Sequence, residues 1–123
     1  MTLLLVVAGG LIGAPLRYLT DLLVQARHDS VLPWGTFTVN IIGSLVLGLV
    51  LGAASSGAVP ASVVAFVGTG ICGALTTFST FGFETVRLLE EGSILAAAAN
   101  AIGSLVAGLV AGTVGWVLVT ALV

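Results

Sequence analysis

Hydrophobic residues run through the chain in four long stretches that short polar segments separate. The stretches extend from about Leu3 to Val24, Trp34 to Ala54, Pro60 to Leu89 and Ser93 to Leu122. Each holds the roughly 20 mostly apolar residues that a helix needs to cross a bilayer. The segments between them carry charges, prolines, glycines and serines, which favour turns. The pattern therefore predicts an all-α integral membrane protein with four transmembrane helices.

The composition agrees with a membrane protein and excludes other classes. Of the 123 residues, 59% are hydrophobic and 7% are charged, whereas soluble domains carry about a quarter charged residues. The net charge is -2, and the sequence has no lysine and no basic stripe. We therefore expect no nucleic-acid binding. The sequence contains no Ser-His-Asp set, no carboxylate pair in an apolar stretch and no phosphate-binding loop, so we expect no enzyme.

The third stretch differs from the others because its middle is polar. The run from Gly73 to Phe81 reads GALTTFSTF, and further glycines flank it. Glycine weakens a helix, and lipid offers no partner to polar groups. We therefore expect a short non-helical break near Gly73 to Thr77 that lines a cavity or binds an ion. A long tilted helix with packing glycines is the alternative.

The second and fourth stretches share an internal repeat. Residues 40–52 match residues 100–112 at 10 of 13 positions with a constant offset of 60. The same offset aligns glycines of the first stretch with glycines of the third. We expect one four-helix domain over residues 1–123, with a possible tandem hairpin repeat of 1–60 and 61–123. Small residues at every fourth position, such as Ser44, Gly48 and Gly52, would let helices approach closely.

Two isolated polar residues lie inside the spans. Arg17 falls about two-thirds of the way through the first span, where it either snorkels to the interface or lines a polar vestibule. Asn40 lies well inside the second span, and a buried amide needs partners. A bond between helices and contact with a substrate are equally compatible with its position.

The polar run of the third stretch also carries an aromatic pair. Phe78 and Phe81 lie on one helical face, with hydroxyl residues between them. Plain packing is the usual role of such a pair, but ring edges are positive and can meet a small anion. Glu84 marks the polar mouth of the same helix, where a pair with Arg87 is the simpler interpretation.

The single cysteine and the single histidine indicate no further functional site. Cys72 is alone, which excludes an intrachain disulfide and a cysteine-based zinc site, so we expect it to be a buried packing residue. His28 lies between Arg27 and Asp29 in a loop and is expected to be solvated. No basic segment precedes the first stretch, which we expect to be a retained membrane helix.

Three motifs resemble signatures of the CrcB/Fluc family of fluoride channels. They are GLIGAPLRY at 10–18, GTFTVNIIGS at 35–44, and GICGALTTFSTF at 70–81, which is followed by Glu84. The length and the number of spans also fit this family.

The resemblance implies an antiparallel, dual-topology homodimer in the inner (plasma) membrane of a prokaryote that passively exports fluoride. It further implies a structural central Na⁺ held by the backbone carbonyls of Gly73 and Thr76. By position, the implied fluoride pathway has Phe78 and Phe81 as an aromatic box, Asn40 as amide donor, hydroxyls from Thr36, Thr77, Ser79, Thr80 and Ser104, and Arg17 and Glu84 near the vestibules.

Some features depart from this family or favour rivals. Asn100 stands where relatives often have tyrosine, and Gly108 where they have serine. All three arginines fall on or toward one side, which by the positive-inside rule weakly favours termini outside.

A small multidrug exporter is the main alternative function. Such an exporter needs a carboxylate deep in the first span, whereas Asp21 lies late in that span and Arg17 lies deeper. A non-transporting scaffold is the third possibility.

Overall fold

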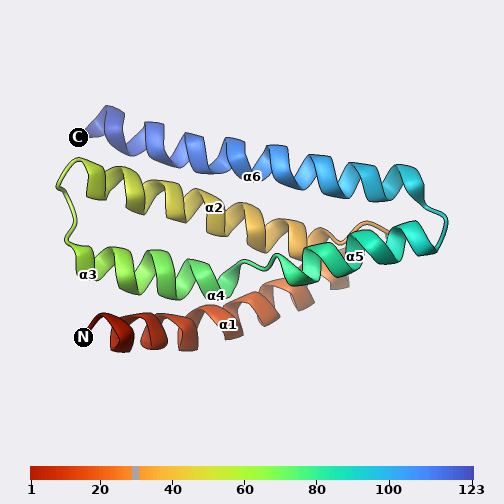
Figure 1. Cartoon of the computed structure of the whole chain (residues 1–123), viewed down its shortest axis with the longest axis horizontal. Coiled ribbons are helices and arrows are strands. Elements are labelled where there is room, and N and C mark those ends of the chain that lie inside the picture. Colours follow the sequence, from red (N-terminus) through yellow and green to blue (C-terminus); the bar gives the residue numbers. More distant parts are fainter. Residues whose placement is uncertain (29–30) are drawn as a thin grey trace.

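The computed structural model describes residues 1–28 and 31–123, and all its regular elements are helices (Figure 1). Asp29 lies outside the described residues. In chain order the elements are α1 (Thr2–Arg27), α2 (Trp34–Ser55), α3 (Ala61–Val63), the π-helix η1 (Val64–Cys72), α4 (Gly73–Leu75), α5 (Ser79–Glu90) and α6 (Ile94–Leu122).

Four segments in the described chain are long and apolar enough to cross a membrane. They are Thr2–Arg27, Trp34–Ser55, Ala61–Glu90 and Ile94–Leu122. The predicted spans are therefore confirmed, with ends that differ by at most a few residues. Figure 1 places both chain termini at the same end of the bundle, as an even number of crossings requires.

The helices stack in the order α6, α2, the third span and α1 (Figure 1). α6 packs mainly along α2, and α1 packs mainly along η1. Large apolar side chains point outward from α1 and α6, including Leu11 and Leu109, while Val39 and Leu88 are fully buried. An apolar exterior of this kind suits lipid or a second protein surface rather than water.

Glycines allow two very close helix contacts. A Cβ atom on Gly48 would overlap the backbone carbonyl of Gly112, so α2 and α6 touch backbone to backbone. A Cβ atom on Gly9 would overlap the carbonyl of Phe66 and lie 2.8 Å from Cα of Gly70. These contacts are the close approaches that small residues permit between membrane helices.

The third span changes its helical geometry along its length. It winds as a π-helix over η1, returns to a single α-turn in α4, and is not helical over residues 76–78 before α5 begins, although the Thr76 N–H still donates to the Cys72 carbonyl at 3.0 Å. Thr76 is extended, with φ -81° and ψ 158°. The non-helical residues 76–78 overlap the expected break near Gly73 to Thr77. They begin later than expected because Gly73 lies inside α4. The sequence did not predict the π-helical turns.

A glycine turn ends α5 and leads into α6. Gly92 has a φ of +79°, which suits a residue without a side chain and turns the backbone away from the helix. Ser93 occupies the N-cap position of α6, but its side chain makes no capping hydrogen bond. Pro60 likewise precedes α3 at its N-cap.

Adjacent glycines in α1 provide a matched test of this packing. We expect Gly9→Ala to lower the stability of the detergent-solubilised protein by about 1–3 kcal/mol, because the added methyl overlaps the backbone of η1. A methyl on Gly10 meets nothing within 4 Å, so Gly10→Ala should be neutral or slightly stabilising. Thermal unfolding of both variants measures the difference, and equal midpoints would contradict this packing.

Candidate functional site

A cavity of about 400 Å³ lies where α2, the third span and α6 meet. Its wall combines groups from segments that are far apart in the sequence. Of the residues singled out by sequence, the structure brings these to the cavity: Asn40, Gly73, Thr76, Thr77, Phe78, Phe81 and Ser104. The amide, the aromatic pair and part of the hydroxyl set therefore share one site.

The side chain of Asn40 makes two hydrogen bonds to the backbone of one residue in the third span. Its Nδ2 donates to the Thr77 carbonyl at 3.1 Å, and its Oδ1 accepts from the Thr77 N–H at 2.8 Å. We call this pair of bonds the amide clamp. An amide has two N–H donors, so the clamp leaves one hydrogen of Nδ2 for another acceptor. The bond between helices is thus present, and contact with a ligand remains chemically possible.

The amide clamp explains why helical bonding stops at residues 76–78. In a continuous helix, the Thr77 N–H would donate to the Gly73 carbonyl, but here it donates to Asn40. Similarly, the Thr80 N–H donates to Thr77 Oγ1 at 3.1 Å instead of to the Thr76 carbonyl. The carbonyls of Gly73 and Thr76 therefore lose the amide partners that a helix would give them.

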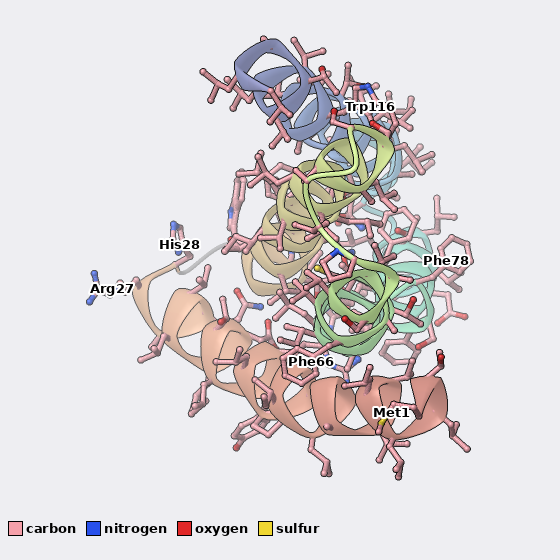
Figure 2. The ribbon with its side chains drawn as sticks, turned by 90° about the vertical axis from the view of Figure 1, so that its left-hand side faces the viewer. Met1, Arg27, His28, Phe66, Phe78 and Trp116 are labelled. Atoms are coloured by element: carbon pink, nitrogen blue, oxygen red, sulfur yellow. The ribbon has the colours of Figure 1, made fainter. Side chains whose placement is uncertain are left out.

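The aromatic pair lies directly after this point. The ring centroids of Phe78 and Phe81 are 5.8 Å apart, with their planes tilted by 46°. Phe78 is 79% exposed and points away from the bundle, as Figure 2 shows. A large aromatic ring so exposed beside a cavity is not core packing within a single chain.

The remaining hydroxyls of the polar run differ in exposure. Thr77 is buried, and its Oγ1 lies 3.4 Å from Ser79 Oγ. Ser79 and Thr80 are exposed at the start of α5. These two side chains do not line the cavity within one chain but lie just beyond it.

A second polar cluster forms away from the cavity, between α1, α2 and α5. Thr36, which is 4% exposed, interacts with the carboxylate of Glu84. The Asp21 carboxylate lies against Gly35 and interacts electrostatically with Glu84. Among the described residues, Asp21 Oδ1 and Glu84 Oε1 are buried without hydrogen-bond partners. Thr36 and Glu84 are therefore grouped with Asp21 rather than with Asn40.

Other expectations have mixed outcomes. Arg17 is half-buried on α1 and does not line the cavity. Arg87 forms an ion pair with Glu91, one helical turn later, where its Nε is 3.9 Å from Oε1, and its interaction with Glu84 is electrostatic without an ion-pair contact. Cys72 is buried, as predicted. His28 is exposed, as predicted, and its Nδ1 lies 2.8 Å from the Val24 carbonyl.

Sequence reasoning missed the partner of Asn100. This residue is 6% exposed, and its Nδ2 donates to Thr85 Oγ1 on α5 at 2.8 Å. The internal repeat offered a signal, because it aligns Asn100 with Asn40. Both asparagines use their amides to tie a neighbouring helix to the third span.

Comparison with known proteins identifies related chains. A family model described as "CrcB-like protein, Camphor Resistance (CrcB)" matches residues 4–116. A Frankia casuarinae protein named "Fluoride-specific ion channel FluC 1" is 60% identical over 120 residues, covering 94% of this chain and 93% of the relative. A Streptomyces avermitilis protein of the same name is 58% identical over 115 residues, with the same coverage. The Methanocaldococcus jannaschii "Fluoride-specific ion channel FluC" is 42% identical over 120 residues, covering 98% and 95%.

The amide clamp yields a stability prediction. We expect Asn40→Leu to destabilise the protein by about 2–4 kcal/mol, because it leaves the Thr77 N–H and carbonyl unpaired in an apolar setting. Hydrogen exchange at the Thr77 amide should accelerate as well. Ser44→Ala is the control, because Ser44 lies one turn later on the same cavity wall and makes no hydrogen bond in the described chain. Equal effects of both substitutions on unfolding and exchange would show that the clamp is not the stabilising contact.

Proposed function

This chain belongs to the CrcB-like family, and from that premise we propose that it is a fluoride-selective channel that lets cytoplasmic fluoride leave passively, down its electrochemical gradient. The relatives named above are called fluoride-specific ion channels. The observation that carries the proposal for this chain is the shared cavity, where an amide, an aromatic pair and hydroxyl groups from three spans come together.

The chemistry of the cavity suits a small, strongly hydrated anion. A selective pore must replace the hydration shell with donors and still release the ion. The second Nδ2 hydrogen of Asn40 can donate, and the hydroxyl of Ser104 can donate when it turns from Asn100 Oδ1 toward the cavity. The edges of Phe78 and Phe81 offer weaker positive contacts. Because strong donors and weak ring-edge contacts lie side by side, the cavity suits an anion that passes through rather than one that stays bound.

We propose that two copies assemble as an antiparallel homodimer with dual topology. One chain leaves the Phe78 ring 79% exposed beside the cavity, so a second copy is needed to enclose a path. Dual insertion requires little charge bias, and the three arginines on or toward one side form only a weak bias. The plasma membrane is the proposed location, where fluoride that enters as HF is expelled.

We further propose that the interruption at residues 76–78 is a functional break in the third membrane helix that holds a structural Na⁺. Hard cations bind oxygen ligands, and the carbonyls of Gly73 and Thr76 lack helical partners on the cavity side. Two carbonyls do not complete an ion shell, so the same pair from the second copy would join them. The ion would add positive charge near the path and favour anions.

The other polar residues would act at the ends of the path. Ser79 and Thr80 are exposed beyond the cavity, and we assign them, with Arg17, Thr36 and Glu84, to the vestibules. The rival function of a small multidrug exporter is not favoured, because the chain matches a CrcB-like family model over residues 4–116.

Fluoride efflux from liposomes tests the proposal directly. Wild-type protein should release fluoride and retain chloride, and failure to release fluoride would contradict the proposed function. Phe78→Ile and Phe81→Ile should each slow efflux by about tenfold, the equivalent of about 1.4 kcal/mol. Phe83→Ile is the matched control, since Phe83 lies on the same helix, exposed and outside the cavity wall. Equal rates for all three variants would exclude the aromatic pair from the path.

Replacing alkali metal tests the central ion. Protein reconstituted with N-methyl-D-glucamine as the sole cation should lose fluoride efflux, and added Na⁺ should restore it, because the freed carbonyls would otherwise lack a partner. Size-exclusion chromatography in the same buffers checks that the dimer persists. Full efflux without any alkali metal would contradict the assignment of Gly73 and Thr76.

A further inference from the structure

We infer that Asn100 is a positioning residue that holds α5, and with it the Phe81 ring, in place against α6. The inference rests on the proposed function, because it gives Asn100 a role in shaping the cavity proposed to pass fluoride. Asn100 itself is not among the residues that line that cavity. Its effect on conduction would therefore pass through other side chains.

A chain of hydrogen bonds runs from α6 to the backbone of Phe81. Asn100 Nδ2 donates to Thr85 Oγ1 at 2.8 Å, and Thr85 Oγ1 donates to the Phe81 carbonyl at 2.9 Å. On the other side of the amide, Ser104 Oγ donates to Asn100 Oδ1 at 3.4 Å. Both ends of this chain, Phe81 and Ser104, lie on the wall of the same cavity.

The chemistry at Thr85 requires a donor from α6. The single hydroxyl proton of Thr85 is directed to the Phe81 carbonyl, so its oxygen can only accept from Asn100. The amide must therefore turn its NH2 group toward Thr85, which leaves Oδ1 facing Ser104. An aspartate of the same size could accept from Ser104 but could not donate to Thr85.

The orientation of α5 depends on the Asn100–Thr85 hydrogen bond more than the orientation of an uninterrupted helix would. The non-helical residues 76–78 separate it from α4, so a continuous helix backbone does not fix its rotation. Phe81, Thr85 and Leu88 recur at the spacing of one helical face, and Leu88 is fully buried. Leu88 holds the far end of this face by packing, and the Thr85–Asn100 bond holds the part next to the cavity.

The test combines fluoride efflux with a measurement on the Phe81 ring. Thr85→Val and Asn100→Leu should each slow efflux by about fivefold, the scale of one lost hydrogen bond. The double variant should be no slower than either single variant, because both remove the same bond. Thr120→Val should leave efflux unchanged. Thr120 makes the same type of bond within its helix, to the Trp116 carbonyl at 2.9 Å, but it is exposed near the end of α6.

The ring itself is followed by ¹⁹F NMR of protein with 4-fluorophenylalanine at position 81. The wild type should give one narrow resonance, and Thr85→Val and Asn100→Leu should give a shifted or divided one, whether or not the protein passes fluoride. Thr85→Ser keeps the hydroxyl and should keep the wild-type spectrum. If Thr85→Val does not fold, Asn100→Asp compared with Thr85→Ser gives the same contrast.

An unchanged Phe81 resonance in the variants that lack the bond would overturn the positioning role, as would additive losses of efflux in the double variant. A wild-type protein that passes no fluoride would instead contradict the proposed function. In that case the NMR comparison alone decides whether Asn100 positions Phe81.

Discussion

The two hydrogen bonds from Asn40 to Thr77 are the contact on which the candidate site depends. In an apolar environment a backbone N–H and carbonyl cannot be left unpaired, so helical bonding can stop in the third span only if another group replaces it. The Asn40 side chain supplies one donor and one acceptor to the same residue. This replacement allows Thr76 to become extended, frees the carbonyl of Gly73 and brings Phe78 to the mouth of the cavity, while the bond from the Thr80 N–H to Thr77 Oγ1 frees the carbonyl of Thr76.

The rest of the bundle fixes the two parts of the third span separately. The part before the interruption is held by close backbone packing, where Gly9 of α1 contacts η1. The part after it is held by the buried Leu88 and by the Asn100–Thr85 bond. Of the two asparagines at equivalent positions of the internal repeat, Asn40 thus acts at the interruption itself and Asn100 acts on α5, which follows it. Polar side chains in this chain organise the helices as well as lining the cavity between them.

The sequence predicted the spans well because hydropathy and length alone determine them. It also indicated the polar run and Asn40, since an amide inside a membrane helix needs a partner. It did not predict the π-helical turns of η1 or the partner of Asn100. It paired Arg87 with Glu84, whereas Arg87 lies next to Glu91. It also assigned Thr36, Glu84 and Asn40 to one path, which stays a prediction, and in the structure Thr36 and Glu84 lie beside Asp21.

We expect the polar run around Thr77 to face water and ions rather than lipid. Water-edited and lipid-edited solid-state NMR of the protein in bilayers tests this expectation. In these experiments each residue receives magnetisation from the water or the lipid that lies next to it. We expect Thr77, Thr80 and Ser104 to receive magnetisation from water, while Leu11 receives it from acyl chains. Transfer to Thr77 and Ser104 from acyl chains alone would contradict the account.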